Sequence, residues 1–264
     1  MNSDIKYFKR WLLLLLLLHV LKEGKCQHNR INTYESIGWY NYFGTFKINE
    51  KIGLHTEYQW RRASLITKPQ QSLLRVGINY QLNPRILFRV GYAWIETFNY
   101  GDLPINVLGR DFTEHRIFQL IQLLHKVSVV DISHRFMLEQ RFVGRYSSAQ
   151  ALTEDEFPLL HRLRYMVRLQ VPIKGKEVVD KTPYLALYNE VFIGFGENVN
   201  ANVFDQNRIG VLLGYRINKN IRIEGGYLNQ ILQFGRQING KNVFQYNNGI
   251  IINANFTLDL SKTR

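Results

Sequence analysis

The chain has 264 residues, a formal net charge of +13, and 13% aromatic residues that include 15 Tyr and 16 Phe. Its length suits one large all-β domain, since no Pro-, Gly- or Ser-rich linker divides it and aromatic side chains favour pleated strands. Its single cysteine, Cys26, excludes an internal disulfide and a metal site built from several thiolates.

Residues 1–26 are predicted to be a cleaved signal peptide. A basic segment at residues 6–10 precedes an apolar run from Trp11 to Leu21 that only His19 interrupts. About 11 residues are too few to span a bilayer as a helix, but they have the length of a signal-peptide h-region. We therefore expect a mature domain over residues 27–264, with a net charge of +10 once the net +3 of the signal peptide is subtracted from +13.

Cys26 could be the last residue of that signal peptide or a lipidation site. Lipoproteins carry small residues just before the modified cysteine, whereas Lys25 occupies that position here. Cleavage after Cys26 is therefore the preferred hypothesis. It leaves a mature domain without cysteine, which excludes a thiol nucleophile.

From residue 35 onwards, apolar and polar residues alternate with a period of two, which is typical of strands with one apolar face. In residues 162–171, for example, apolar side chains occupy every second position and Arg162, Arg164 and Arg168 lie between them. Segments of this kind are found, in chain order, at 36–48, 51–62, 72–82, 85–98, 113–125, 130–143, 160–172, 183–194, 206–217, 221–233 and 242–259.

The length of these segments favours a membrane barrel over a soluble sandwich. A tilted strand crosses a bilayer with about 9–11 residues, whereas strands of globular proteins average about 5–6. Barrels in membranes also carry aromatic residues at both interfaces. The candidates for such girdles are Tyr80, Tyr92, Trp94, Tyr165, Tyr215 and Tyr227.

Short and long connections alternate along the chain. Short ones are expected at 49–50, 83–84, 126–129, 173–182 and 218–220, and longer ones at 63–71, 99–112, 144–159, 195–205 and 234–241. Bacterial barrels have short periplasmic turns, long extracellular loops and an even number of strands. One further crossing is then needed, and only 28–36 can supply it. We predict an antiparallel, up-and-down transmembrane β-barrel of 12 strands with both ends in the periplasm, with ten or fourteen strands as the alternatives.

Charged residues gather on the face opposite to the apolar one. We assign that face to the lumen, because an ionised side chain facing lipid at mid-depth costs about 2–4 kcal/mol. The candidate lumen network consists of Arg75, Arg89, Glu114, Arg116, Arg135, Glu139, Arg141, Arg162, Arg164, Arg168, Glu190, Arg208, Arg222 and Glu224. The same face also carries Arg61, Arg216 and Glu57, which brings it to twelve arginines and five glutamates.

Two functions fit this inner face. A structural or binding barrel could fill its lumen with paired Arg and Glu side chains, as narrow barrels do. The alternative is a narrow passive pore whose positive lining favours anions. Under both hypotheses the basic excess points into the lumen, so we do not expect nucleic acid as a partner.

Several short segments also carry a family resemblance in their order and spacing. They are Leu74–Gly77, Gly91–Tyr92, Glu114–Arg116, His134–Arg135, Glu139–Phe142, Arg162–Tyr165, Asn189–Glu190, Phe204–Arg208 and Gly226–Gln230. Over about residues 39–256 the chain resembles an uncharacterised family of Gram-negative outer-membrane barrels, the domain of unknown function 2490. The resemblance implies an outer-membrane location, contact with outer-membrane lipid, and insertion by the barrel-assembly machinery. It implies no activity and no ligand.

The C-terminus departs from the common pattern of such barrels. Many of them end on an aromatic residue, whereas this chain ends with the segment Asp259–Arg264. Phe256 and Leu258 are the nearest candidates for the signal that the assembly machinery reads.

No catalytic, metal or cofactor site is predicted, and we do not expect an enzyme. Ser133 and His134 are adjacent in a strand, so their side chains point to opposite faces. His115 and His134 lie on the apolar face, where a lipid-modifying enzyme is the alternative to interfacial histidines. The histidines show no metal-type spacing, and the acidic run Thr153–Glu156 is expected to be a solvated loop.

Overall fold

The computed structural model describes residues 30–199 and 202–261. The predicted signal peptide, its cleavage site and Cys26 lie outside these residues. Among the described residues, no helix is long and apolar enough to cross a membrane. The elements are β1 (Arg30–Lys47), β2 (Ile52–Ala63), β3 (Lys68–Asn83), β4 (Ile86–Thr97), β5 (Phe112–Val127), β6 (Val130–Val143), β7 (Leu159–Pro172), β8 (Thr182–Phe195), the 3₁₀ turn η1 (Glu197–Val199), β9 (Phe204–Asn218), β10 (Ile221–Ile238) and β11 (Lys241–Asp259).

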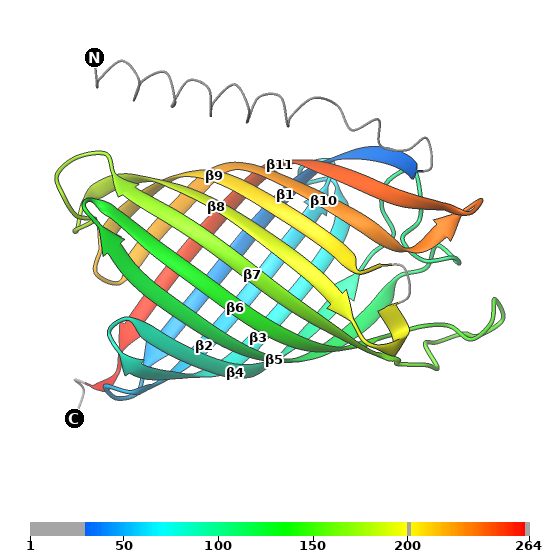
Figure 1. Cartoon of the computed structure of the whole chain (residues 1–264), viewed down its shortest axis with the longest axis horizontal. Helices are drawn as coiled ribbons and strands as arrows, with labels where there is room; N and C mark the ends of the chain where they lie inside the picture. Colours follow the sequence, from blue (N-terminus) through cyan, green and yellow to red (C-terminus); the bar gives the residue numbers. More distant parts are fainter. Residues whose placement is uncertain (1–29, 200–201, 262–264) are drawn as a thin grey trace, which may run out of the picture. The chain divides into compact units, whose positions relative to one another are not determined.

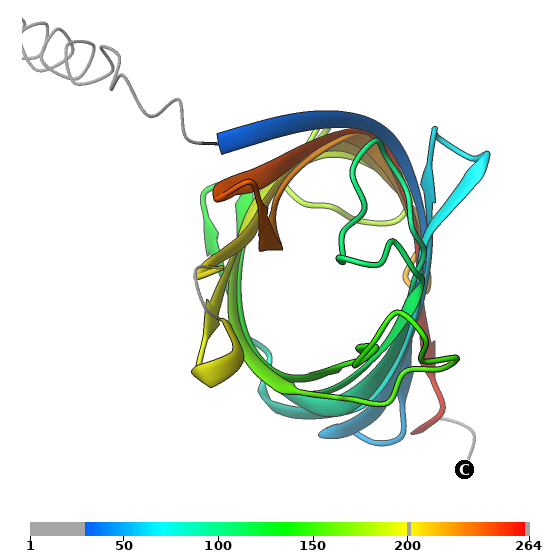
Figure 2. The same ribbon diagram turned by 90° about the vertical axis from the view of Figure 1, so that its right-hand side faces the viewer.

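The strands form a closed barrel, shown from the side in Figure 1 and end-on in Figure 2. Each strand pairs antiparallel with the next one in the chain, and β1 lies beside β11. Across this closure the Asn41 side-chain amide donates a hydrogen bond to Asn253 Oδ1 at 2.8 Å. The predicted all-β, up-and-down barrel is confirmed.

The strand number differs from the predicted twelve, because the described residues contain 11 strands. Residues 30–36 do not form a separate crossing but are the first part of β1, which runs for 18 residues without a turn. Gly38 stays in the strand because it pairs with Arg62 of β2. Eleven strands with antiparallel neighbours place β1 and β11 in the same direction, so their pairing is parallel. The prediction that both ends of the barrel chain lie on one side is therefore wrong for the described residues.

The connections between strands lie alternately at the two ends of the barrel, which are here called the turn side and the loop side. The turn side carries residues 48–51, 84–85, 128–129, 173–181 and 219–220, and the loop side carries 64–67, 98–111, 144–158, 196–199, 202–203 and 239–240. Two expected long connections, 63–71 and 234–241, are wrong, because the flanking strands extend into these ranges and leave only 64–67 and 239–240 between them. Asn239 and Gly240 have φ angles of +52° and +70°, as a two-residue hairpin turn requires, and Asn-Gly is the sequence that favours this turn.

The two faces of the strands follow the alternation in the sequence. In β3, Leu74, Val76 and Ile78 are exposed on the outer surface, whereas Arg75 and Asn79 are buried inside. This arrangement reverses that of a soluble β-protein. The outer surface is apolar, and the polar side chains that the sequence places between the apolar ones fill the barrel.

The interior is not uniformly polar. Buried apolar side chains from β1 and β8–β11 pack into one cluster, which consists of Ile37, Trp39, Tyr184, Ala186, Leu212, Leu228 and Ile251. The charged residues come mainly from β2–β7 and from the start of β9. Side chains therefore fill the barrel from both sides, with an apolar wall facing a charged one.

Candidate functional site

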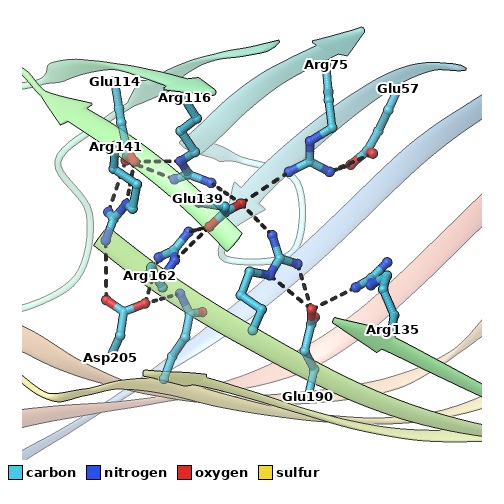
Figure 3. A network of polar contacts seen from close by, with 12 residues as sticks. Glu57, Arg75, Glu114, Arg116, Arg135, Glu139, Arg141, Arg162, Glu190 and Asp205 are labelled. Atoms are coloured by element: carbon cyan, nitrogen blue, oxygen red, sulfur yellow. Dashed lines mark hydrogen bonds and ion pairs between the residues drawn. The ribbon is translucent and has the colours of Figure 1, made fainter. Parts of the chain in front are cut away.

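Glu139 of β6 is the centre of a charged network inside the barrel (Figure 3). Its side chain is 0% exposed. Arg162 Nη2 lies 2.6 Å from Glu139 Oε2, and Arg164 Nη1 lies 2.8 Å from Glu139 Oε1. Arg116 and Arg75 approach the same carboxylate at 3.7 and 3.8 Å. One fully buried carboxylate thus offsets part of the positive charge of guanidinium groups from β3, β5 and β7.

Two further carboxylates extend this network towards the loop side. Glu114 is 2.5 Å from both Arg116 and Arg141 and accepts two hydrogen bonds from each. Asp205 is 2.6 Å from Arg162 and 3.7 Å from Arg141. Such forked contacts hold a guanidinium in one orientation, so the strands from β5 to β9 are connected through side chains inside the lumen.

Glu190 and Glu57 extend the network in the other directions. Glu190 Oε1 lies 2.7 Å from both Arg135 and Arg164, and Glu57 lies 2.7 Å from Arg75. The contacts are continuous from β2 to β9. The central network, as the term is used below, consists of Glu57, Arg75, Glu114, Arg116, Arg135, Glu139, Arg141, Arg162, Arg164, Glu190 and Asp205.

A second charged pair lies nearer the turn side. Arg168 of β7 reaches Glu224 of β10 at 2.5 Å, although these two strands are not neighbours in the sheet. Glu224 also accepts hydrogen bonds from the Tyr184 hydroxyl at 2.8 Å and the Asn253 amide at 3.1 Å. The pair therefore bridges the lumen and ties the charged wall to the apolar one.

Four arginines predicted for the inner face have no carboxylate partner among the described residues. Arg89 and Arg208 donate hydrogen bonds to side-chain amides at 2.6 and 3.0 Å, and Arg61 also bonds to side-chain amides. Arg222 is exposed. The structure thus brings most of the predicted lumen residues into ion pairs, but leaves Arg89, Arg208 and Arg222 outside them.

Asp205 is a network residue that the alternation in the sequence did not indicate. The predicted strand began at residue 206, and a period of two would turn neighbouring side chains to opposite faces. The β8–β9 register instead shifts between Phe192 and Ile193, which pair with Gln206 and Phe204. Asp205 is the extra residue of this bulge, and both Asp205 and Gln206 are buried. A bulge breaks the alternation and re-aims a side chain, which explains why the sequence pattern missed Asp205.

Two cavities lie inside the barrel, one near each end. The loop-side cavity has a volume of about 480 Å³ and the turn-side cavity about 570 Å³. The charged residues lining the loop-side cavity are Arg61, Arg116, Arg141, Arg145, Arg162, Arg208, Arg236, Glu114 and Asp205. Those lining the turn-side cavity are Arg85, Lys126, Arg135, Arg168, Arg222 and Asp131. Glu139 lines neither cavity. Cationic side chains outnumber carboxylates in both.

The connection 98–111 folds into the loop-side mouth of the barrel (Figure 2) and contributes to the lining of the loop-side cavity. The Tyr100 hydroxyl donates a hydrogen bond to Gln245 Oε1 at 2.8 Å, and Arg236 donates to the Pro104 carbonyl at 2.5 and 3.1 Å. Burial raises the pKa of Tyr100, so its phenol stays protonated and remains a donor. The loop is held against β10 and β11.

The histidines on the outer face contact tyrosines. His115 Nδ1 lies 2.6 Å from the Tyr92 hydroxyl, and His134 Nδ1 lies 2.8 Å from the Tyr165 hydroxyl. The Ser133 hydroxyl accepts a hydrogen bond from the Gln122 amide at 3.1 Å. Within residues 30–199 and 202–261, no group of three or more His, Cys, Asp or Glu side chains is arranged to hold a metal ion.

Comparison with known proteins identifies a family of unknown function and a solved structure of similar fold. The family described as "Protein of unknown function (DUF2490)" matches residues 37–240. No curated protein matches the chain. A solved structure titled "NanC porin structure in rhombohedral crystal form" is 12% identical, with a TM-score of 0.47, and the match covers 84% of this chain and 98% of that one.

Proposed function

The chain belongs to the DUF2490 family of proteins of unknown function, and we propose that it is an outer-membrane barrel whose lumen is closed by the central network. In this proposal the barrel has a structural or binding role and does not conduct ions freely.

The outer surface supports a membrane location. Exposed apolar residues follow one another around the barrel, among them Leu54, Val76, Ile78, Val90, Leu185, Leu187, Val211, Leu213, Ile250 and Ile252. Soluble monomers rarely expose apolar patches beyond a few hundred Å². The strands have 12 to 19 residues, more than the 9–11 that a crossing needs. We therefore propose outer-membrane lipid and, during insertion, the barrel-assembly machinery as partners, after removal of the signal peptide.

The main support for a closed lumen is the position of Glu139. Its carboxylate is fully buried and contacts Arg162 and Arg164 at 2.6 and 2.8 Å, with Arg116 and Arg75 within 4 Å. These side chains fill the space between the loop-side and turn-side cavities on the charged wall. Water running along the charged wall would have to hydrate this carboxylate, which has no exposed surface. Narrow barrels are filled by side chains in this way.

Planar-bilayer recording on the purified full chain tests the closed lumen. We expect no steady conductance, or a very small one, from samples whose folding is shown by a gel shift between boiled and unboiled protein. Replacing Arg162 and Arg164 together by alanine should increase the conductance, because two groups that cross the lumen are removed. Arg62→Ala is a matched control, since Arg62 bonds to the carbonyls of Ile66 and Thr67 in the connection 64–67. A large steady conductance of the unmodified chain would refute the closed barrel.

A narrow anion-favouring pore is the second candidate. The observation that favours it is the cationic excess in both cavities, since a positive lining attracts anions and repels cations. In the same recordings, anion selectivity that weakens with added salt would support this pore, because salt screens the lining charges. Cation selectivity would contradict both candidates.

We further propose that the chain is not an enzyme and does not bind nucleic acid. The outer-face histidines are engaged with Tyr92 and Tyr165, and neither shares a hydrogen bond with a serine in the described part of the chain. Most of the arginines assigned to the inner face are enclosed by the barrel, where a nucleic-acid duplex cannot reach them. An assay for hydrolysis of outer-membrane phospholipid tests the first statement, and turnover abolished by His134→Ala would overturn it.

A further inference from the structure

Arg61 and Arg208 are the buried members of the four inner arginines that lack a carboxylate partner. They are 7% and 8% exposed, and both line the loop-side cavity. Arg61 comes from β2 and Arg208 from β9, on different sides of the barrel closure. Both guanidinium groups lie over the ring of Trp39, at 4.0 and 4.7 Å from its centroid. The indole thus brings two cationic groups to one place in the cavity wall.

The groups that these two guanidinium groups contact directly are neutral. Arg61 donates to the side-chain amides of Gln59 and Gln71. Arg208 donates through Nε to Gln206 at 3.0 Å, and no hydrogen bond among the described residues uses its Nη1 or Nη2. The rings of Trp39 and Phe192 flank its guanidinium. Aromatic faces attract a cation but carry no net charge to balance it.

Among the described residues, no carboxylate lies within ion-pair distance of this pair, so the protein does not balance its charge by direct contact. A buried ion costs several kcal/mol of desolvation unless it is paired or hydrated. The Nη groups of Arg208 are planar donors, and a guanidinium binds carboxylate or phosphate oxygens through two parallel hydrogen bonds. The loop-side cavity has room for such a group, since about 480 Å³ lies within the range of small-molecule sites, about 300–1,000 Å³.

We propose that Arg61 and Arg208 form a binding site for the carboxylate or phosphate group of a small anion in the loop-side cavity. The inference deepens the binding role proposed above by naming the site and the chemistry of its ligand. The side-chain amides of Gln70, Gln230 and Gln233 line the same cavity, so its wall is polar around the two guanidinium groups. The ligand enters from the loop side, because the central network lies below the cavity.

The connection 98–111 gives this site a partial cover. Ile105, Val107 and Leu108 of that connection line the cavity, and Tyr100 is fastened to β11 through Gln245. An anion bound at Arg61 and Arg208 would therefore lie between the loop above and the central network below. Limited solvent access strengthens the attraction between a guanidinium and an anion, because the effective dielectric constant is lower than in water.

Calorimetric titration of the folded full chain in a non-ionic detergent tests the proposal at low ionic strength. The probes are inorganic phosphate, acetate and, as a neutral solute, glycerol. We expect saturable binding of phosphate or acetate and none of glycerol, and the two anions decide whether the site prefers phosphate or carboxylate. Arg61→Gln and Arg208→Gln should each weaken binding at least tenfold, whereas Arg208→Lys, which keeps the charge but loses the fork, should weaken it less.

Two controls locate the site. Arg62→Gln removes the same charge one residue away, and Arg222→Gln removes an unpaired arginine from the turn-side cavity; both should leave the affinity unchanged. The absence of saturable anion binding, or equal affinity in folded Arg208→Gln, would overturn the proposal, and loss of binding in Arg222→Gln would move the site to the other cavity and overturn it as well. These outcomes are independent of conductance, so they are distinguishable from failure of the closed barrel.

Discussion

Glu139 and Arg162 occupy directly opposite positions on β6 and β7, and their side chains meet inside the barrel at 2.6 Å. The cross-strand register alone brings them together, because opposite residues on one face of an antiparallel pair have neighbouring Cβ atoms. Arg162 then reaches past β8 to Asp205 on β9. A local pair and a contact across the lumen thus share one guanidinium.

Glu139→Gln should destabilise the barrel more than any other single replacement of a network carboxylate. It leaves the buried guanidinium groups of Arg162 and Arg164 with one compensating charge fewer, and breaking a buried pair costs about 3–5 kcal/mol. Urea unfolding of the protein in detergent micelles measures the change. Glu50→Gln, in the exposed connection 48–51, is the matched control and should have no measurable effect. Equal stability of the two variants would contradict the role of Glu139.

Asp205→Asn should also destabilise the barrel, but less than Glu139→Gln. Arg162 keeps its contacts with Glu139 when Asp205 is neutralised, and Arg141 keeps Glu114. The two carboxylates share Arg162, so their replacements should not be additive; coupled neighbours differ from additivity by about 0.5–3 kcal/mol. The double variant in the same unfolding assay measures this coupling. Strict additivity would show that the network does not act as one unit.

Val211→Arg should impair assembly if the outer face contacts lipid. Val211 lies in β9 and is 44% exposed on the outer surface, and an arginine at mid-depth costs about 2–4 kcal/mol. Val203→Arg makes the same change directly before β9, outside the strand, where the side chain is 54% exposed, and it should be tolerated. The fraction of heat-modifiable protein in outer-membrane preparations measures assembly. If both variants assembled equally well, the lipid-facing assignment of β9 would be wrong.

The Asp155 carboxyl should titrate at a lower pH than an ordinary aspartate. Its carboxylate accepts hydrogen bonds from the Ser147 hydroxyl and backbone N–H, and these bonds lower the pKa of Asp155. Because the pKa is depressed, these bonds stabilise the loop 144–158 fully at pH values above the pKa of an ordinary aspartate. The stabilisation is lost as the pH falls through the pKa of Asp155 in the folded state. Carbon-detected NMR titration of the carboxyl measures the midpoint. Ser147→Ala should raise it, and an unchanged midpoint would contradict the assignment.

The alternation of residue types was sufficient to predict which segments are strands and which way their side chains face. Arg75 and Arg162 were predicted to face the lumen, and the structure places both inside, because adjacent side chains of a regular strand point to opposite faces. The alternation does not say which carboxylate an inward arginine meets. Partners such as Glu139 and Arg75 belong to strands β6 and β3, which are not neighbours in the sheet. Their side chains meet only because the sheet closes into a barrel and both point into its lumen.

By itself, the sequence determined an all-β barrel with an apolar outside and a basic inside, because a period of two encodes both faces of every strand. Only the tertiary structure decided the features that depend on closure. The 11 strands and the parallel β1–β11 pairing follow from β1 running straight through residues that could have formed a separate crossing. The inward turn of Asp205 follows from a register shift against β8. Arg61 and Arg208 remain without an ion pair because both guanidinium groups lie against the ring of Trp39 and no carboxylate comes within ion-pair distance among the described residues, which no local pattern of residues records.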